Sequence, residues 1–321
     1  MKRIFIVSVS MHKNLWIALL FVVAFGACKK DEPSVTTDQD LLISNWLEER
    51  NLTATRAENG IYYYRIEENA AGDQVGQGGD VLAFYYQLFD LEENLLAGFQ
   101  RSDGDSLLAK TGASAFFPIG LDGLFSVMRE GEKYAFLIPA SAGYGEVASL
   151  NTSDGSNVVR LEVQLVGLFS ESDIDAIESN RIQTFIAEND LDSVEIFGSG
   201  IAYQDLILGN EEPVQNGVTL VVSYSLSHLD GGIIFSNESI TYVLGSGFPS
   251  PLIPGLEFGL SLLSPGERGL IIIPSSQAYR ESAQIIPSSI VQELIESGIV
   301  PAYVADITPY KTLVFDVTRN Q

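Results

Sequence analysis

Hydrophobic and polar positions follow the same pattern twice along the chain. Apolar residues at helical spacing predict a short amphipathic helix at 43–52 and a second one at 182–191. Segments rich in β-branched and aromatic residues follow each helix and predict strands. These predicted strands are 60–67, 81–88, 134–138 and 158–168 in the first half, and 200–208, 218–226, 269–273 and 312–317 in the second. In each half one apolar segment between strands, 121–128 or 256–263, predicts a short helix that ends near a glycine.

The two halves also match in individual residues. The matches, in chain order, are Ile43 with Ile182, Gly60-Ile61 with Gly200-Ile201, Gly131-Glu132 with Gly266-Glu267, and Tyr144 with Tyr279. Ordered similarity of this kind indicates two homologous domains, at 38–169 and 172–321. Because strands flank a single short helix in each, we expect two tandem α+β units. Each would be a curved antiparallel β-sheet packed on a short α-helix and preceded by an amphipathic helix.

The N-terminus is predicted to be an export signal and an anchor. Positively charged residues precede an apolar run at 15–27, which is shorter than the roughly 20 residues that span a bilayer, so residues 1–27 fit a secretory signal. The single cysteine, Cys28, follows in a context that resembles a bacterial lipobox, and the Lys-Lys-Asp-Glu after it resembles surface-export signals of Bacteroidetes lipoproteins. The resemblance implies lipidation of Cys28, a polar tether at 28–37, and attachment to the outer membrane at its periplasmic face or at the cell surface. A buried free thiol at Cys28, and Met1 or Met11 as the true start, remain open alternatives.

Composition excludes several classes of function. The 321 residues include 18 Lys+Arg and 42 Asp+Glu, for a net charge of -24, and so acidic a surface repels nucleic acids. One cysteine and two histidines cannot form a disulfide framework or a Cys/His zinc cluster, so we expect no metal site and no cofactor.

The second half carries a series of motifs in a fixed order. They are Val222-Ser-Tyr224-Ser, Asp230-Gly-Gly-Ile-Ile-Phe235, Tyr242-Val-Leu-Gly245, Leu252-Ile253-Pro-Gly255-Leu256, Pro265-Gly-Glu-Arg268, Ile273-Pro-Ser-Ser-Gln-Ala278-Tyr279 and Ile307-Thr-Pro309-Tyr-Lys-Thr-Leu-Val-Phe315. In this order and spacing, the segment from about 200 to 318 resembles the FKBP family of peptidyl-prolyl cis-trans isomerases. The first half resembles the family over fewer motifs and lacks a separate Val-Ile-Pro-Gly loop, so we expect a degenerate copy there.

The resemblance implies an apolar cleft that binds a prolyl ring. Its catalytic positions in the second domain would be Tyr224, Phe235, Ile253, Tyr279 and Phe315, and its further substrate-binding positions Ile240, Leu252 and Leu256. Leu256 would form the floor and the two phenylalanines the walls, while the Ile253 N–H and the Tyr279 hydroxyl would donate hydrogen bonds to the substrate. The first-domain counterparts would be Tyr85, Leu121, Tyr144 and Leu161.

Three features depart from the family pattern. Ser236 stands where the family has an acidic residue, and Arg280 stands where it has a glycine. An insertion at 288–306, with helical spacing at 290–297, would sit on the loop that overhangs the second cleft. There it could contact a partner or close the site, or it could be a surface decoration.

Three functions are compatible with these features. The first is a membrane-anchored isomerase that assists the folding of exported, proline-containing polypeptides, with the second domain the active copy. The second is an FKBP-like chaperone or protein-binding lipoprotein with little or no turnover. The third is a structural subunit of a cell-envelope complex.

Overall fold

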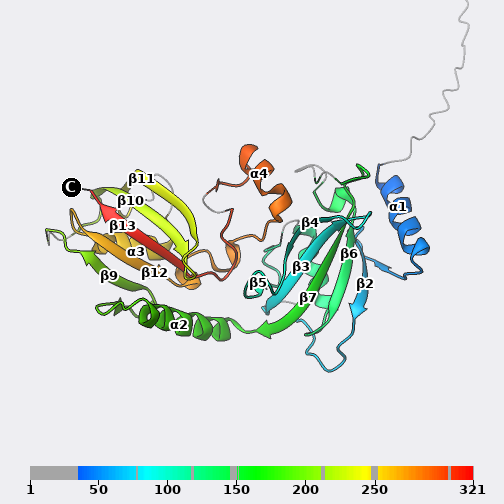
Figure 1. Ribbon diagram of the computed structural model, residues 1–321, viewed down its shortest axis with the longest axis horizontal. Helices are drawn as coiled ribbons and strands as arrows, with labels where there is room; N and C mark the ends of the chain where they lie inside the picture. The colour runs from blue at the N-terminus through cyan, green and yellow to red at the C-terminus, as the bar shows by residue number, and fades with distance from the viewer. Residues whose placement is uncertain are drawn as a thin grey trace, which may run out of the picture.

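The computed structural model describes residues 35–320, except 77–78, 117–118, 145–149, 151, 211–213, 247–251 and 303–304. The predicted signal at 1–27 and Cys28 lie outside the described residues, as does most of the predicted tether. Two antiparallel sheets, each with its own helices, lie at opposite ends of an elongated molecule (Figure 1). This arrangement confirms the predicted α+β class with two tandem units, which we call domain 1 and domain 2.

Domain 1 begins with a helix and continues into a sheet. Its elements are α1 (Val35–Glu49), β1 (Thr55–Arg56), β2 (Tyr62–Glu67), β3 (Val81–Asp90), β4 (Leu95–Phe99), β5 (Leu107–Lys110), the 3₁₀ helix η1 (Ile119–Val127), β6 (Lys133–Ile138), η2 (Ala140–Ala142) and β7 (Val159–Phe169). The strand order is β1-β2-β6-β7-β3-β4, and β5 also pairs with β3.

Domain 2 repeats this order with two differences. Its elements are α2 (Glu171–Glu188), β8 (Glu195–Ile196), β9 (Ala202–Ile207), β10 (Thr219–His228), β11 (Ile233–Val243), α3 (Pro254–Leu262), β12 (Arg268–Ile273), η3 (Ser275–Gln277), η4 (Arg280–Ser282), α4 (Ser288–Glu296) and β13 (Leu313–Arg319). The strand order is β11-β10-β13-β12-β9-β8. One long strand, β11, replaces β4 and β5, and α4 has no counterpart among the residues of domain 1 that the structure describes.

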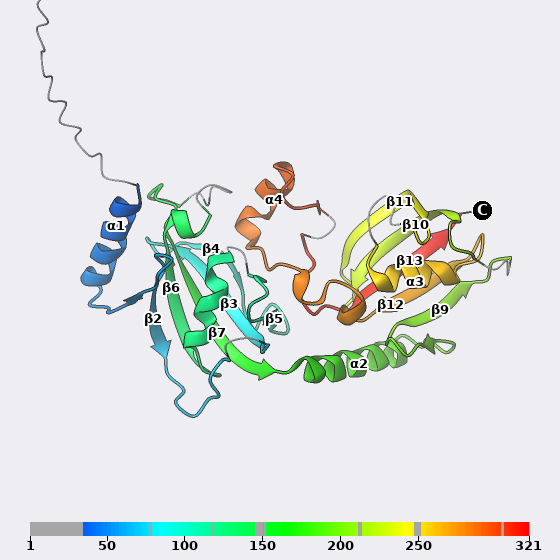
Figure 2. The ribbon, with the colours of Figure 1, turned by 180° about the vertical axis from the view of Figure 1, so that it is seen from behind.

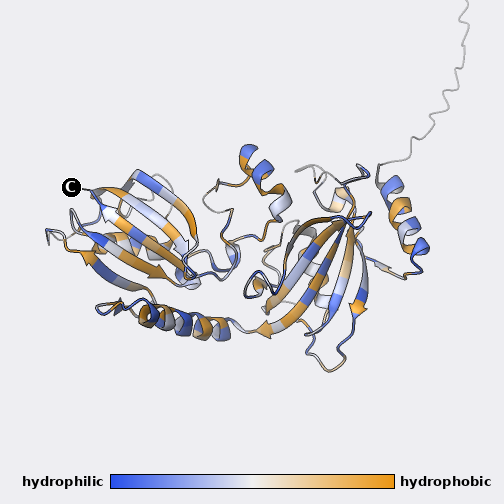
Figure 3. Cartoon of the chain, in the orientation of Figure 1, coloured by the Kyte–Doolittle hydropathy of each residue, from blue (hydrophilic) through white to orange (hydrophobic). Residues whose placement is uncertain are grey.

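Each sheet is covered on both faces. The N-terminal helix packs on one face, with Ile43 against Leu137 and Val158 in domain 1, and Ile182 against Ile272 and Val314 in domain 2. The short helix covers the other face, and Figure 2 shows η1 and α3 in these places. Apolar residues accordingly concentrate on the strands of both sheets (Figure 3).

The short helix of domain 1 differs from the expected form. The segment 119–127 is a 3₁₀ helix, whereas α3 is an α-helix as predicted. Pro254 at the first position of α3 supplies a backbone angle already suited to a helix, and domain 1 has Ile119 at the start of its helix instead. The prediction of an α-helix in domain 1 was therefore wrong.

The first helices of the two domains are pinned to their sheets in the same way. In domain 1 the Gln39 side chain accepts a hydrogen bond from the Ala140 N–H at 3.1 Å. In domain 2 the Glu178 carboxylate accepts from the Ser275 N–H at 3.0 Å, from the Ser275 hydroxyl at 2.5 Å and from the Thr312 hydroxyl at 2.8 Å. Both acceptors are buried, and both bind the residue that follows the proline at the end of a central strand. This shared contact supports the internal repeat at the level of single side chains.

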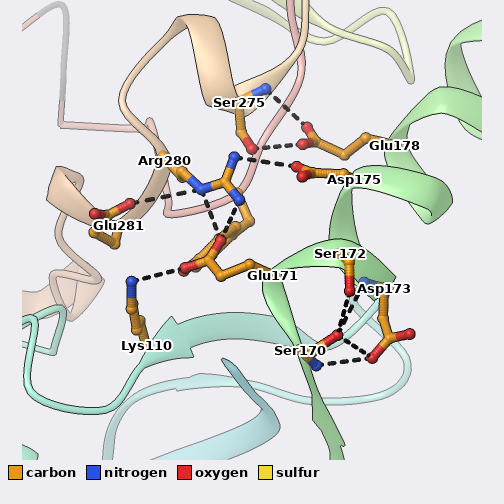
Figure 4. A network of polar contacts seen from close by, with 11 residues as sticks. Lys110, Ser170, Glu171, Ser172, Asp173, Asp175, Glu178, Ser275, Arg280 and Glu281 are labelled. Atoms are coloured by element: carbon orange, nitrogen blue, oxygen red, sulfur yellow. Dashed lines mark hydrogen bonds and ion pairs between the residues drawn. The ribbon is translucent and has the colours of Figure 1, made fainter. Parts of the chain in front are cut away.

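A charged network joins the two domains where α2 begins (Figure 4). Glu171 contacts Lys110 of domain 1 at 2.9 Å and, on its domain 2 side, Arg280 Nε at 2.7 Å and the Tyr310 hydroxyl at 2.9 Å. Partial burial by itself would raise the pKa of the Glu171 carboxyl, but these donors hold that pKa below its ordinary value. The carboxylate therefore stays charged and links a strand of domain 1 to a loop of domain 2.

Candidate active site

Strand register brings three aromatic rings of domain 2 onto one face of the sheet. Leu226 of β10 pairs with Phe235 on one side and with Phe315 on the other. Tyr224 lies two residues away on the same strand and therefore points to the same face. The ring centroids of Tyr224 lie 5.7 Å from Phe315 and 6.2 Å from Phe235, within the usual range for aromatic contacts.

Helix α3 closes one side of this aromatic group. Two glycines let the helix lie directly on β12, because a Cβ on Gly255 would be 2.2 Å from Ile273 and one on Gly259 would be 2.5 Å from Ile271. Leu256 projects from this helix into the core and is 6% exposed. Ile253 precedes the first helical turn, so its N–H is not used by the helix's own hydrogen bonds.

Tyr279 borders the group where the chain leaves η3. It is half-buried and packs against the same apolar core. Beside it lies an apolar cavity of ≈ 220 Å³, whose lining is Tyr279, Ser282, Ala283, Gln284, Ile286, Ile299, Val300, Pro301 and Ile307. The segment that carries α4 thus forms one wall of the space next to Tyr279.

All eight domain 2 residues expected in a cleft belong to one apolar cluster. Leu256 and Phe315 are buried, and the other six are half-buried: Tyr224, Phe235, Ile240, Leu252, Ile253 and Tyr279. Partial burial leaves some surface of these six side chains accessible, and apolar, aromatic surfaces of this kind are typical of ligand sites. Within the part of the chain that the structure describes, no group of three or more His, Cys, Asp and Glu residues could hold a metal ion.

The two substituted positions lie away from this aromatic group. Ser236 is exposed and pairs with Ser225 of β10, the residue between Tyr224 and Leu226. Arg280 has a φ of 43°, in the left-handed region that glycine tolerates best. Its guanidinium turns towards α2 and binds Glu171 and Asp175 (Figure 4).

Arg280 therefore holds Glu171, the residue that contacts Lys110 of domain 1, a role that the sequence analysis missed. The available signal was the acidic start of α2, with Glu171 and Asp173 in its first turn and Asp175 shortly after it, combined with a cation at a position that normally holds glycine.

The counterparts in domain 1 are sealed. Leu121, Tyr144 and Leu161 are all 0% exposed, and burial raises the pKa of the Tyr144 hydroxyl well above its ordinary value. Leu88 pairs with Ala97 and Leu161 as Leu226 pairs with Phe235 and Phe315.

Strand register corrects one of these counterparts. Tyr86 lies opposite Val163 as Tyr224 lies opposite Val317, so Tyr86 and not Tyr85 is the counterpart of Tyr224. The reason is that two tyrosines stand next to each other on β3, and an alignment displaced by one residue exchanges the side chain that faces the core for the one that does not. Tyr86 is buried, which raises its pKa to about 12, whereas Tyr85 stacks on Phe99 near the surface.

The insertion differs from the expected overhang. Its helix, α4, packs against β4 of domain 1, and only its flanking residues reach the cavity beside Tyr279. The reason is burial of apolar side chains, because Ile290 and Leu294 are 0% exposed and belong to the core of domain 1.

Comparison with known proteins assigns a family to most of domain 2. Residues 210–319 match the model of the FKBP-type peptidyl-prolyl cis-trans isomerase family. Domain 2 belongs to that family. The match confirms the family that the motifs of the second half indicate. No match was found among curated proteins.

Several solved FKBP structures are similar to the chain. FkpA from Escherichia coli is 21% identical, with 47% of this chain and 63% of that chain covered and a TM-score of 0.32. A peptidyl-prolyl cis-trans isomerase from Pseudomonas syringae is 20% identical, with 46% and 93% covered and a TM-score of 0.33. The three FKBP domains of wheat FKBP73 are 15% identical, with 82% and 95% covered and a TM-score of 0.31. The chain thus spans less than two thirds of the length of FkpA.

Proposed function

We propose that domain 2 catalyses cis-trans isomerisation of X–Pro peptide bonds and that domain 1 does not. The observation that carries this proposal is the difference in access to equivalent positions. Phe235 and Tyr279 are half-buried at an open aromatic surface, whereas Ala97 and Tyr144 of domain 1 are buried.

The chemistry needs only the groups found at this surface. The barrier to rotation is amide resonance, roughly 18–20 kcal/mol, so a site that binds the twisted amide more tightly than the planar one accelerates the reaction. Phe235, Phe315 and Leu256 would hold the prolyl ring away from water. The Ile253 N–H and the Tyr279 hydroxyl would donate to carbonyl groups of the twisted peptide.

A proline-peptide isomerisation assay on residues 29–321 tests this proposal with matched tyrosine variants. We expect Phe235→Ala to lower kcat/KM by about 10-fold or more, because it removes a wall of the prolyl site, and Tyr279→Phe to lower it by a smaller factor. Tyr144→Phe is the control, since it makes the same change in the sealed domain and should leave kcat/KM unchanged. No rate above the uncatalysed reaction, or equal losses in Tyr279→Phe and Tyr144→Phe, would contradict the proposal.

A second candidate is a chaperone that binds polypeptides without turnover. The observation in its favour is Ser236, which is exposed and uncharged where the family has an acidic residue. Retained binding of an unfolded protein by a chain that gives no isomerisation would support this candidate over the first.

We further propose that Cys28 carries the lipid anchor and that the clients are exported, proline-containing polypeptides. Support comes from the sequence, since Cys28 follows an apolar signal. Among the residues that the structure describes, no helix has both the length and the apolar character needed to cross a bilayer. Labelling with a fatty acid that is lost in Cys28→Ser would support the anchor, and protease access in intact cells would separate the cell surface from the periplasmic face.

A partner contact through 288–306 would have to use the polar side of the insertion. Gln292, Glu293 and Glu296 are the exposed residues on this side of α4. A capture experiment with wild type and a Gln292→Ala/Glu293→Ala/Glu296→Ala variant tests for a structural subunit, which requires a stable partner that only the wild type retains.

A further inference from the structure

A segment of domain 2 enters the core of domain 1. The Ile285 N–H donates to the Ala115 carbonyl at 2.7 Å, and Ile285 forms a parallel β-bridge with Phe116. Beyond this bridge, Ile290, Leu294 and Val300 are buried in the main core of domain 1. Figures 1 and 2 show the result: α4 lies beside β4, away from the sheet of its own domain.

The place that this segment occupies is the counterpart of the domain 2 cleft. Phe116, which pairs with Ile285, makes an edge contact with Tyr86 at a centroid distance of 5.2 Å. Tyr86 is the counterpart of Tyr224. A cavity of ≈ 530 Å³ has Tyr86 and Leu107 on its domain 1 side, and Ile285 and Ile286 also line it. The segment therefore faces the positions that form the aromatic group in domain 2.

The missing ring of domain 1 explains why the segment fits. Ala97 of β4 stands at the register position of Phe235 and is 5% exposed. β4 therefore has a small side chain where β11 has a phenyl ring, and α4 packs against this strand. A cleft without its aromatic wall would otherwise leave apolar side chains in contact with water. Each Å² of apolar surface left exposed costs about 25 cal/mol of stability.

Helix α4 has one apolar side and one polar side. Ile290 and Leu294 stand four residues apart and are both 0% exposed, whereas Gln292, Glu293 and Glu296 are exposed. This is the pattern of an amphipathic helix held in an apolar groove. Both ends of the segment continue into domain 2, so its effective concentration at the groove is high and no strong intrinsic affinity is needed.

We propose that segment 283–300 is the resident ligand of the domain 1 cleft, which takes an aliphatic amphipathic helix in place of a client polypeptide. The cleft is occupied from within the same chain, and clients are left with domain 2. The proposal does not depend on turnover by domain 2. It assigns domain 1 a binding role whose ligand class is set by Ala97, Leu107 and the absence of the Phe235 ring.

Release of the helix tests the proposal in the chain comprising residues 29–321. In Ile290→Asn/Leu294→Asn the apolar side of α4 becomes polar, and in the control, Gln292→Asn/Glu296→Gln, only exposed residues change. We expect amide hydrogen exchange in β4 and η1 to become at least about 10-fold faster in the first variant and to stay unchanged in the control. A synthetic peptide of residues 283–302 should then restore protection in the release variant and bind wild type at least about 10-fold more weakly.

Unchanged exchange in β4 and η1 of the release variant would overturn the proposal. So would failure of the peptide to restore protection while β6 and β7 remain protected, because domain 1 would then be folded with a surface that does not bind the helix. If the double variant unfolds domain 1, Leu294→Ala replaces it, and the peptide should raise the thermal midpoint of that variant but not of wild type. A peptide that leaves this midpoint unchanged also overturns the proposal.

Isomerisation measured on the same samples separates the two proposals. Restored protection with no isomerase activity in any sample would leave the resident ligand standing and contradict the proposed catalysis. Normal activity with no effect of the peptide would do the reverse.

Discussion

The two domains share a scaffold and differ in what fills the cleft. Where domain 2 has Phe235 and Phe315 beside Leu226, domain 1 has Ala97 and Leu161 beside Leu88. In domain 2 the rings remain half-buried or form the base of an open surface, and in domain 1 aliphatic side chains from α4 complete the core. The difference teaches that replacement of both aromatic wall residues changes what fills the cleft, although the sheet around it is preserved.

Truncation of the equivalent leucines should give the largest contrast. Leu121→Ala removes a fully buried side chain, and we expect it to lower the free energy of unfolding of domain 1 by about 2–5 kcal/mol. Leu256→Ala opens a cavity next to the accessible aromatic group, so it should cost domain 2 less stability and should lower kcat/KM by about 10-fold.

The chain provides a probe that separates these effects. Trp16 lies in the predicted signal, so Trp46 is the only tryptophan of residues 29–321, and it packs in domain 1. Denaturant unfolding followed by Trp46 fluorescence therefore reports domain 1, while isomerisation reports domain 2. The Leu121→Ala variant should keep its isomerase activity at denaturant concentrations below the midpoint of Trp46 unfolding. Loss of activity under these conditions would contradict the assignment of catalysis to domain 2 alone.

The helix pins should give a smaller contrast of the same kind. Glu178→Ala leaves the Ser275 N–H and two hydroxyl groups without their acceptor, and we expect a loss of about 3 kcal/mol in domain 2. Gln39→Ala removes one accepted and one donated hydrogen bond in domain 1 and should cost about 1 kcal/mol.

Denaturant unfolding measures both variants, with Trp46 fluorescence for domain 1 and far-ultraviolet circular dichroism for the remaining transition. Glu178→Gln, which keeps an acceptor oxygen, should fall between wild type and Glu178→Ala. Equal losses for Gln39→Ala and Glu178→Ala would show that the two helices are held by packing and not by these side chains.

Acid should weaken the two domains at different pH values, because two equivalent residues, Asp90 and His228, titrate differently. Asp90 pairs with Val159 and His228 pairs with Leu313, so both stand at the same end of the sheet. Although burial opposes it, hydrogen bonds from Asn94 and Ser153 lower the pKa of Asp90 to about 2. Burial and Lys311 lower the pKa of His228, against weaker opposing effects of Asp230 and Asp306.

Both shifts favour the deprotonated form in the folded state, so stability falls as the pH falls. For His228 the loss begins below about 6.5, the ordinary histidine pKa, and for Asp90 it begins near pH 4 and continues to about pH 2, where it amounts to about 2 kcal/mol. We expect domain 2 to weaken first on acidification. Unfolding between pH 7 and 5 should lose part of its pH dependence in His228→Gln, and Asp90→Asn should flatten the dependence of Trp46 unfolding below pH 4. If the pH dependence of unfolding is unchanged in both variants, the expectation that domain 2 weakens before domain 1 is contradicted.

Sequence patterns were sufficient for the repeat and for the domain 2 cluster. The alternation of apolar residues predicts strands that lie within or close to those observed, and the motifs around Tyr224, Leu256 and Tyr279 identify residues that the fold brings together. The one register error arose where two similar residues are adjacent. Tyr85 and Tyr86 are adjacent aromatic residues, so local pattern alone cannot say which one faces the core.

The chain by itself determined two similar sheets and one set of aromatic cleft residues, because strand alternation and helix periodicity are local properties. Only the tertiary structure decided that α4 leaves its own domain and that Lys110 and Glu171 join the two halves. Burial of Ile290 depends on β4 and the core of domain 1, far away in sequence, and no local pattern records where an apolar helix face will find its partner.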